Sequence, residues 1–399
     1  MPDSMAALAI NGGTPVRATL LPYARQSITE DDVAAVAAAL RSDWLTTGPR
    51  VPAFERELAA CTGARHAVAF SSGTAALHGA AVAAGIGPGD EAITTPMTFV
   101  ATANCVLYAG GEPRFADVDP GTLLIAPDAV RAALTPRTRA IIAVDYAGQP
   151  ADYAALRSVA RAAPGGPIPV IADASHSLGA TLDGRRVGTL ADLSILSLHP
   201  AKILTTGEGG AVLTDDDRMA DRLRRFRNHG IGTELAARRD WTYDMVELGY
   251  NYRLTDVGAA LGSSQLARID AFLARRRELA AHYLRRLGDH PLLDVPELAP
   301  GADPAWHFMF VQLRLDRLRV GRGEVFRALR AEGIGVNVHY IPVHRHSFYR
   351  ERWPEVSMPV AEAAYERLLT LPLFAGMTTA DADDVVAALD KVTTAYRDE

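Results

Sequence analysis

The chain has 399 residues, of which 48% are hydrophobic and 22% are charged, and this balance is typical of a globular protein with room for two domains. The net charge of −6, without a basic cluster, argues against nucleic acid as a partner. No uninterrupted apolar run reaches the length of about 18 residues that a membrane helix needs, so we do not expect a membrane protein.

Cysteine usage and the start of the chain indicate a compartment. Cys61 and Cys105 are the only cysteines, which gives no disulfide framework and fits a reducing environment. The first ten residues lack the basic start of a secretory signal. We therefore expect a cytoplasmic protein.

From about residue 29 the sequence alternates between helical and strand patterns. Thr29, followed by Asp32, predicts a capped helix start. Short apolar runs predict strands at residues 66–71, 91–95, 113–118, 140–145, 169–173, 193–198 and 211–214. Segments rich in Ala and Leu predict helices between them, at residues 75–84, 101–108, 127–134 and 153–163. This alternation favours an α/β fold with a mostly parallel seven-stranded sheet between helices, whose ligands bind at the carboxyl ends of the strands.

The last third of the chain predicts a smaller α+β domain. A long helical pattern over residues 255–287 leads into it. A short strand and a loop at 298–304 come next, and then a strand, a helix, a strand and a terminal helix at 307–313, 323–332, 336–340 and 379–394. We therefore divide the chain into a large α/β domain (residues 1–265) and a linking helix with a small domain (266–399). We expect residues 1–28 to pack near the small domain.

A lysine and an aspartate follow neighbouring strands of the predicted sheet. Lys202 stands between the strand pattern that ends near His199 and a loop rich in Thr and Gly, and Asp173 ends the run at 169–173. Pyridoxal 5′-phosphate (PLP) requires such a pair, because a lysine amine forms the Schiff base and a carboxylate keeps the pyridinium nitrogen protonated. A lysine after a strand is more often a surface residue, so the interpretation depends on this pair and on a site for the phosphate.

Ser72, Gly73 and Thr74 offer that site, because they open the helix predicted at 75–84. Free N–H groups at a helix N-terminus, beside hydroxyls, can hold a phosphate, although the same string is also an ordinary helix cap. Ser197 could add a further hydroxyl. Phe99 follows the next strand and could stack on a planar cofactor, although a core phenylalanine is the common alternative.

Two other kinds of site are not expected. His339, His344 and His346 lie close in sequence, but no Cys or His-Glu pattern completes a zinc set, so we expect no metal. The glycines at 207–210 precede a strand rather than a helix, so they are not a dinucleotide fingerprint.

The motifs resemble, in content and order, those of the DegT/DnrJ/EryC1/StrS group of PLP-dependent nucleotide-sugar aminotransferases, which have the fold type I of PLP-dependent transferases. The resemblance covers nearly the whole chain and is carried by residues 42–49 (SDWLTTGP), 72–74 (SGT), 98–102 (TFVAT), 173–176 (DASH), 197–202 (SLHPAK), 205–210 (TTGEGG) and 249–256 (GYNYRLTD). Within the group, residues 22–28, 144–149 and 338–344 are most similar to the pseudaminic-acid-pathway enzymes that aminate C4 of a UDP-linked 4-keto-6-deoxy-N-acetylhexosamine.

The resemblance implies a role for each matching position. Lys202 would carry PLP and move the proton, Asp173 would pair with the pyridinium nitrogen, and His176 would lie near the phenolic oxygen of the ring. The remaining cofactor residues would be Gly73, Thr74 and Ser197 at the phosphate, Phe99 on the ring, and Asn251, reaching the phosphate from the partner subunit of a homodimer. The residues implied at the sugar-nucleotide site are Tyr23, Thr46, Arg253, His339 and Tyr340.

The implied reaction is a ping-pong transamination. An amino acid, which we expect to be L-glutamate, would convert PLP to pyridoxamine phosphate (PMP). The amino group would then pass to the C4 keto group of a nucleotide-linked 4-keto-6-deoxy sugar of the UDP-N-acetylhexosamine type. Two alternatives stay open: a C3 or C4 aminotransferase for a dTDP-deoxysugar of a natural-product pathway, and a non-catalytic PLP-binding regulatory protein. Relatives that dehydrate at C3 carry histidine in place of the lysine, so Lys202 argues against that reaction.

Overall fold

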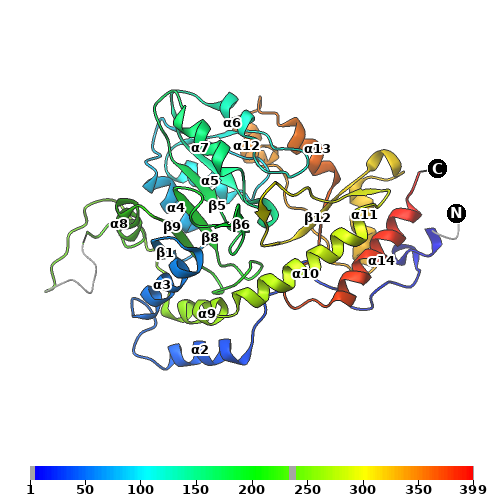
Figure 1. Cartoon of the computed structure of the whole chain (residues 1–399), viewed down its shortest axis with the longest axis horizontal. Coiled ribbons are helices and arrows are strands. Elements are labelled where there is room, and N and C mark those ends of the chain that lie inside the picture. Colours follow the sequence, from blue (N-terminus) through cyan, green and yellow to red (C-terminus); the bar gives the residue numbers. More distant parts are fainter. Residues whose placement is uncertain (1–4, 233–239, 399) are drawn as a thin grey trace.

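The computed structural model describes residues 5–232 and 240–398. A seven-stranded sheet lies between helices in the larger part of the molecule (Figure 1). Helix α10 (Ile269–Leu287) runs from this part to a smaller group of strands and helices, where the chain also begins and ends.

The central sheet is mostly parallel. Its strand order is β1-β9-β8-β5-β4-β2-β3, and only β9 runs antiparallel to its neighbours. The strands are β1 (His66–Phe70), β2 (Glu91–Thr94), β3 (Glu112–Phe115), β4 (Thr138–Val144), β5 (Val170–Asp173), β8 (Leu193–Ser197) and β9 (Gly210–Thr214). The predicted seven-stranded sheet is therefore confirmed.

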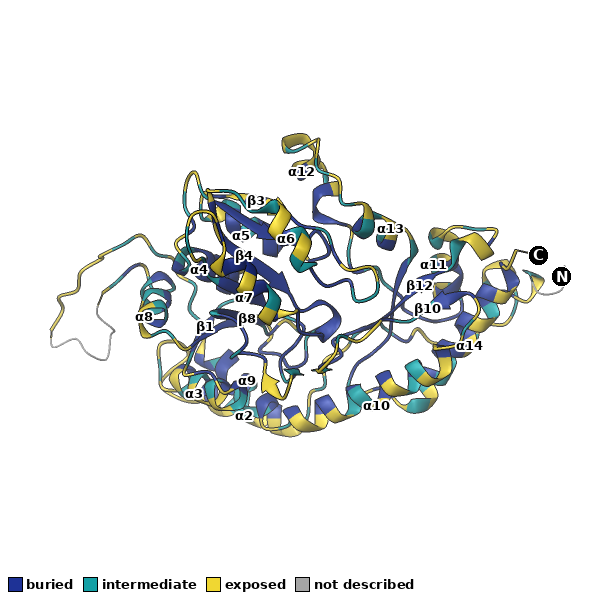
Figure 2. Cartoon of the chain, turned by 45° about the horizontal axis from the view of Figure 1, so that its top comes forward, coloured by how far each residue is buried: buried dark blue, intermediate teal, exposed yellow. Residues whose placement is uncertain are grey.

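The inner strands are largely apolar on both faces because helices cover both faces, whereas the edge strand β3 exposes Glu112 and Arg114. Successive residues of β4 show this, since Ile141 and Ala143 belong to one hydrophobic core and Ala140 and Ile142 to another. The first core includes residues of α3 (Arg50–Thr62), α7 (Tyr153–Arg161) and α9 (Asp256–Leu266), and the second includes residues of α4 (Gly73–Ala83), α5 (Ala101–Tyr108) and α8 (Asp217–Phe226). Figure 2 shows the resulting buried centre of the larger part.

The helix predicted over residues 255–287 is wrong in one respect, because it is two helices, α9 and α10. The break at Ala267 and Arg268 contains no proline or glycine. It coincides with a contact to α2 (Glu30–Leu40), where the buried Asp32 accepts hydrogen bonds from Ser264, Gln265 and Arg268. A tertiary contact thus accompanies a break that the helical pattern did not contain.

The smaller part has its own three-stranded antiparallel sheet of β10 (Leu293–Asp294), β12 (Met309–Leu313) and β13 (Leu368–Leu371). The strand predicted at 336–340 is wrong, since Asn337 makes only an isolated bridge to Thr370. The Tyr340 hydroxyl lies 3.1 Å from His176 Nε2, beyond β5, so this segment leads from the small sheet to the edge of the central sheet. The edge strand β13 was not predicted.

The smaller part also has a separate hydrophobic core. Residues of α10, α11 (Arg322–Ala331) and α14 (Thr379–Ala395) pack there against β12 and β13. The N-terminal segment joins it through Leu8 and Leu21, and the Glu332 carboxylate accepts hydrogen bonds from the Ala9 and Val16 N–H groups. The domain boundary at residue 265 stays a proposal, which this separate core supports.

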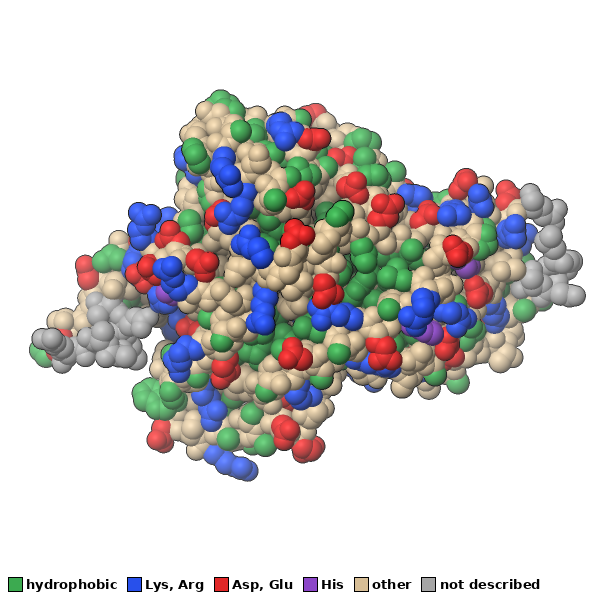
Figure 3. Space-filling model, in the orientation of Figure 1, with side chains coloured by type: hydrophobic (Ala, Val, Ile, Leu, Met, Phe, Trp, Pro, Cys, Tyr) green, Lys and Arg blue, Asp and Glu red, His purple; other side chains and the backbone are tan. Residues whose placement is uncertain are grey.

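The remaining elements include a small sheet of β11 (Ala302–Asp303), β6 (Thr181–Leu182) and β7 (Arg185–Arg186). The remaining helices are α6 (Pro127–Ala133), α12 (Ser347–Arg352) and α13 (Pro359–Arg367). Basic and acidic side chains mix over the face shown in Figure 3. Within the part of the chain that the structure describes, no helix has both the length and the apolar character needed to cross a bilayer.

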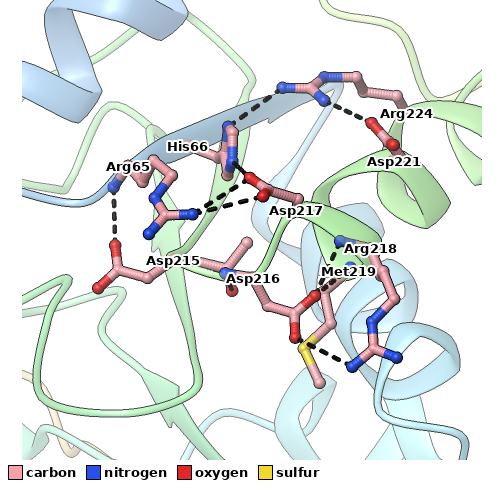
Figure 4. Close-up of polar contacts among 10 residues, drawn as sticks. Arg65, His66, Asp215, Asp216, Asp217, Arg218, Met219, Asp221 and Arg224 are labelled. Carbon is pink, nitrogen blue, oxygen red and sulfur yellow. Dashed lines mark hydrogen bonds and ion pairs between the residues drawn. The ribbon is translucent and has the colours of Figure 1, made fainter.

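Helix α8 is tied to the start of β1 by charged side chains (Figure 4). Asp216 caps the helix, since its carboxylate accepts the Arg218 and Met219 N–H groups at 2.8 and 3.0 Å. The first helical residue, Asp217, lies 2.6 Å from the His66 ring and also pairs with Arg65. These ties hold the N-terminal end of α8 against the start of β1.

Candidate active site

Lys202 and Asp173 meet at the carboxyl edge of the central sheet. β5 and β8 are parallel neighbours, so Asp173, the last residue of β5, and Lys202, in the turn after β8, lie at the same edge. The Lys202 N–H donates to the His199 carbonyl at 2.8 Å, which closes that turn. Burial lowers the pKa of Lys202 to about 8, against the opposing effect of the Asp173 carboxylate. An amine with this pKa is partly neutral near pH 7, as a nucleophile or a base must be.

Lysine is rare in this chain, so few residues could form a Schiff base with PLP. The sequence contains one lysine besides Lys202, namely Lys391. The Lys391 ammonium donates to Glu332 and to the Thr14 carbonyl, both at 2.8 Å, beside the core of the smaller part. A lysine that binds an aldehyde at the sheet edge can therefore only be Lys202.

The loop after Lys202 is a hydrogen-bonded turn that returns the chain to β9. The Leu198 carbonyl accepts both the Thr206 N–H and the Thr205 hydroxyl at 3.0 Å, and the Thr205 hydroxyl oxygen accepts the Gly207 N–H. Gly207 has φ +82°, a conformation that favours glycine. The Thr- and Gly-rich string thus holds Lys202 against the end of β8.

The predicted phosphate loop lies at the N-terminus of α4. The Ser72 hydroxyl accepts the Ala75 N–H at 3.1 Å and caps the helix. A Cβ atom added to Gly73 would lie 2.9 Å from the Ser197 Cβ, so this close approach requires glycine. It brings the hydroxyls of Ser197 and Thr74 and the free N–H groups of the first helical turn to one place, where they could hold a phosphate.

Asp173 is held in place by its neighbours. The Thr102 hydroxyl donates to Asp173 Oδ2 at 2.6 Å, and the Ser175 N–H donates to Oδ1 at 3.2 Å. Thr102 lies in the TFVAT string, but sequence reasoning gave it no role. Phe99, from the same string, is 58% exposed and its ring lies 6.3 Å from that of Tyr340, so it is not a core phenylalanine.

His176 is buried in a group of rings at the same edge. Its Nε2 lies 3.1 Å from the Tyr340 hydroxyl, and its ring centroid lies 4.4 Å from that of His307. Burial, and then the charge of Lys202, hold the pKa of both histidines well below the usual value, so both rings are neutral. Their Nδ1 atoms are buried without a hydrogen-bond partner. Sequence reasoning missed His307, since a histidine at the start of a strand carries no distinguishing pattern.

The smaller part and the N-terminal segment bring further rings to this group. His339 Nδ1 lies 2.9 Å from the Thr370 hydroxyl, and the Tyr23 ring lies 5.4 Å from that of His339. Burial and the charge of Lys202 lower the pKa of His339 to about 3. Burial, with a smaller effect of Asp173, raises the pKa of Tyr340, which stays a neutral phenol. We call Lys202, Asp173, His176 and Tyr340 the strand-edge cluster.

Three predicted site residues lie apart from the strand-edge cluster. Thr46 and Asn251 are exposed, and among the described residues no hydrogen bond, ion pair or ring contact joins them or Arg253 to that cluster. Arg253 donates to Asn228 at 2.8 Å and lines a separate cavity of about 1230 Å³ between α3 and α8. Within one chain the structure therefore does not bring these residues to Lys202.

The strand-edge cluster and the phosphate loop together fit PLP. The cluster offers an amine with a lowered pKa, a carboxylate fixed by Thr102 and a buried, unpartnered Nδ1 on His176, and the loop offers a cradle at Gly73 that a Cβ would fill. When bound, PLP supplies an electron sink that stabilises negative charge on a substrate carbon. Residues 5–232 and 240–398 contain no group of three His, Cys, Asp or Glu side chains that could hold a metal ion.

Comparison with known proteins leads to the same chemistry. The model of the DegT/DnrJ/EryC1/StrS aminotransferase family matches residues 26–390. PseC of Helicobacter pylori, an aminotransferase of pseudaminic acid biosynthesis, is 28% identical; the match covers 95% of this chain and 100% of PseC, with a TM-score of 0.88. Spr1654 of Streptococcus pneumoniae, solved in its PMP form, is 28% identical over 94% of this chain and 99% of that chain, with a TM-score of 0.88. DesI, solved with its TDP-sugar product, is 32% identical over 98% and 97% of the two chains, with a TM-score of 0.87.

These similarities confirm the predicted fold type I and the predicted cofactor, PLP. They also set aside the non-catalytic alternative, because the family and its solved members are enzymes. The chain belongs to the DegT/DnrJ/EryC1/StrS aminotransferase family and is a PLP-dependent sugar aminotransferase.

Proposed function

We propose that the protein transfers an amino group from an amino acid, expected to be L-glutamate, to the C4 keto group of a nucleotide-linked 4-keto-6-deoxy sugar of the UDP-N-acetylhexosamine type. The observation that supports amino transfer most directly is that Lys202, whose pKa is about 8, and Asp173 lie at the same edge of the sheet. Similarity to PseC supports the sugar type.

In this proposal Lys202 binds PLP and then serves as the base. Its Nζ would take a proton from the amino-acid carbon and deliver one to the cofactor in the first half-reaction, and would take a proton from the cofactor and deliver one to the sugar carbon in the second. A pKa near 8 suits both directions, because neither the neutral amine nor the ammonium is rare near neutral pH. The buried rings of His176 and His307 keep water away from this amine.

The other cofactor roles remain those that the sequence predicts. Asp173, fixed by Thr102, faces the ring nitrogen, and the unpartnered Nδ1 of His176 is available to the phenolic oxygen. The exposed ring of Phe99 is free to stack on the cofactor. The phosphate is held by Gly73, Thr74 and Ser197 of one subunit and Asn251 of the other.

Substrate recognition is assigned to residues at the strand-edge cluster and to two residues that lie apart from it within one chain. Tyr23, His339 and Tyr340 are neutral hydrogen-bonding groups, which suits the hydroxyl and keto groups of a sugar. Arg253, with Thr46 beside it, is assigned to the diphosphate, since a guanidinium binds phosphate oxygens in pairs.

We propose a homodimer with shared active sites. Within one chain Asn251 and Arg253 do not contact the strand-edge cluster, so their predicted roles require a second copy. Large apolar side chains are exposed on the same two segments of the chain: Trp44 is 49% exposed, Leu45 is 51% exposed and Leu248 is 74% exposed. Such a surface is typical of an interface, and a two-fold dimer would form two equivalent composite sites.

Complementation between two inactive variants tests this dimer. We expect the Lys202→Ala chain and the Asn251→Ala/Arg253→Ala chain each to be inactive alone. A mixed dimer should regain about half of the wild-type activity, because one of its two sites then contains no substitution. Separately tagged chains, purified in two affinity steps, would isolate the mixed dimer for the assay.

A matched control mixes the Lys202→Ala and Asp173→Ala chains. Both residues belong to the same chain in each site, so every site of this mixed dimer is damaged and activity should not return. If the first mixed dimer also stays inactive, Asn251 and Arg253 serve their own subunit and the shared-site proposal is wrong.

A second candidate substrate is a dTDP-linked 3-keto or 4-keto deoxysugar. Similarity to DesI, solved with its TDP-sugar product, favours this candidate. That similarity covers 98% of this chain, whereas the similarity to PseC covers 95%. The two candidates differ in the base and in the N-acetyl group, which one or two polar contacts distinguish.

A panel of keto sugars tests the function. The PMP form of the enzyme is mixed with UDP-4-keto-6-deoxy-N-acetylhexosamine, dTDP-4-keto-6-deoxyhexose or dTDP-3-keto-deoxyhexose, and the return of PLP absorbance is followed. We expect the UDP-linked sugar to react at least about tenfold faster, as a difference of 1–3 kcal/mol in transition-state binding would give. A faster dTDP-linked sugar would establish the second candidate, and no reaction with any keto sugar would contradict amino transfer to sugars.

A further inference from the structure

His78 lies at the centre of a cage of aromatic rings in the second core. It belongs to α4 and is 4% exposed. Four rings surround it, at centroid distances of 4.9 Å (Phe226), 5.1 Å (Tyr250), 5.6 Å (Tyr108) and 5.9 Å (Tyr252), and three of them meet it edge-on. The cage therefore joins α4 to the ends of α5 and α8 and to the segment that carries Asn251.

The cage also has a polar contact. His78 Nδ1 lies 3.3 Å from the Tyr252 hydroxyl. Burial lowers the pKa of His78, against a smaller opposing effect of the Tyr108 backbone, so the ring is neutral and has one donor and one acceptor nitrogen. A neutral imidazole can meet the Tyr252 hydroxyl and still pack against the rings.

The segment around Asn251 is oriented by this cage. Tyr250 and Tyr252 stack on each other, with centroids 4.9 Å apart and planes 11° apart. Alternate residues of an extended chain point to the same side, so Asn251, between the two tyrosines, points away from the cage and is exposed. Asn251 is thus turned away from its own core.

Backbone hydrogen bonds connect the same segment to α8. The Tyr250 N–H donates to the Phe226 carbonyl at 2.8 Å, and the Tyr252 N–H donates to the Arg227 carbonyl at 3.0 Å. The charged ties shown in Figure 4 hold α8 against β1. The segment is therefore fixed to a helix that is itself fixed to the sheet.

The cage is directly connected to the phosphate loop of its own chain. The Ser71 N–H, one residue before the helix cap Ser72, donates to the Tyr252 carbonyl at 2.8 Å. The same helix thus begins at Gly73, in the phosphate cradle, and reaches the cage at His78. One rigid unit contains the cradle for one phosphate and the segment that carries Asn251.

We propose that His78 is a positioning residue that orients Asn251 and couples it to the phosphate loop of the same chain. The cage holds Asn251 outward, toward the cofactor phosphate of the second copy, while Ser71 and α4 hold the cradle for the phosphate of the first. The two cofactor sites of the dimer are therefore connected through His78. The orientation of Asn251 stands on the cage alone, whereas the connection between sites rests on the proposed shared-site dimer.

Hydrogen–deuterium exchange of the protein without added PLP tests the orientation. In His78→Ala, the Tyr250, Tyr252 and Ser71 amides should exchange on the order of tenfold faster, because the packing that opposes local opening is lost. His78→Phe keeps a ring in the cage and should change the rates by less than about threefold. Leu77→Ala removes a buried side chain from the same helix and keeps His78 and all four cage rings, so it controls for a general loss of core packing and should change the rates of these amides less than His78→Ala does.

Unchanged exchange at these amides in His78→Ala overturns the proposal. If His78→Ala does not fold, Tyr250→Ala replaces it, because this ring is 36% exposed and its removal opens the same cage. Tyr250→Ala should then accelerate the Tyr252 and Ser71 amides similarly, and unchanged rates would overturn the proposal in the same way.

Mixed dimers test the connection between sites by PLP affinity, measured by titration. Both dimers have one Lys202→Ala chain, so each has one site that can bind PLP as a Schiff base, and the Kd is measured for this covalently bound PLP by its absorbance. In the first, His78→Ala is placed on the Lys202→Ala chain, which supplies Asn251 to the intact site, and the Kd should rise about tenfold, as loss of one charge-assisted hydrogen bond would give. In the second, His78→Ala is placed on the chain with the intact Lys202, and the Kd should rise less.

The two experiments separate the two proposals. Faster exchange together with a larger loss in the second dimer would retain His78 as the residue that orients the segment, but would contradict the shared-site dimer. Equal Kd values for both mixed dimers and the Lys202→Ala/wild-type dimer would overturn the coupling itself. Rescue of the Kd by His78→Phe in the first dimer would show that the cage, rather than a general loss of stability, is responsible.

Discussion

Lys202→Ala is expected to lower kcat/KM by more than about 10⁴-fold, since proton transfer by a placed base alone contributes about 10²–10⁴-fold and covalent attachment is lost as well. Borohydride reduction of the PLP form should fix the cofactor to the peptide that contains residue 202 in the wild type. The variant should yield no labelled peptide, although it should still bind PLP through the phosphate loop. Mass spectrometry of the digested protein is the measurement.

The matched control is Lys391→Ala, because Lys391 is the second of only two lysines in the chain. Its ammonium pairs with the buried Glu332 carboxylate in the smaller part, so its loss should lower stability but leave labelling at residue 202 intact in the folded protein. A labelled Lys391 peptide in Lys202→Ala, with retained activity, would contradict the assignment. Because the chain has only two lysines, no third lysine side chain could account for a labelled peptide.

Asp173→Asn and Asp173→Ala should each lower kcat/KM by about 10²–10³-fold. The carboxylate lies in a buried site, where a charge-assisted hydrogen bond contributes much more than in water, and the loss of one such contact costs about 3–4 kcal/mol of transition-state stabilisation. Steady-state kinetics should show a fall in kcat rather than a rise in KM, because the contact serves the chemical step.

Thr102→Val separates the orientation of Asp173 from its charge. The substitution removes the hydroxyl that donates to Asp173 Oδ2 at 2.6 Å and keeps the shape of the side chain. We expect a loss of about tenfold, because one hydrogen bond to a charged group contributes about 1.5 kcal/mol or more.

Near-normal turnover of both Asp173 variants would remove Asp173 from the mechanism.

Local sequence patterns determined the main features of the larger part. The inner strands of the central sheet are short, largely apolar runs because helices cover both faces, so such a run indicates burial on both faces. The edge strand β3 is different, since Glu112 and Arg114 are exposed and alternate with buried residues. Lys202 and Asp173 were found because polar residues that end such runs collect at one edge when the strands are parallel. The turn after Lys202 was equally local, since threonine hydroxyls and a glycine with positive φ close it without help from distant residues.

Contacts between distant segments decided the features that the sequence could not give. The helical pattern at 255–287 has no breaking residue, and the break between α9 and α10 occurs where Asp32 binds the chain from another helix. The segment 336–340 has a strand pattern, but only Asn337 bridges to the small sheet, and Tyr340 lies at His176. In both places the contact is made with a segment far away in sequence, which the local pattern does not contain.

The site itself shows the same division. The residue types of the strand-edge cluster could be predicted, but the positions of Thr102, which fixes Asp173, and of His307, which packs on His176, depend on how α5 and β12 approach the sheet edge. In the strand order β1-β9-β8, antiparallel β9 lies between β1, which leads into Gly73, and β8, which ends at Ser197. This order brings Gly73 against Ser197. Sequence by itself thus determined which chemical groups the chain has at its strand ends, because alternation and apolar runs are local. Only the tertiary structure decided which of those groups meet, because their approach is set by the packing of elements that are remote along the chain.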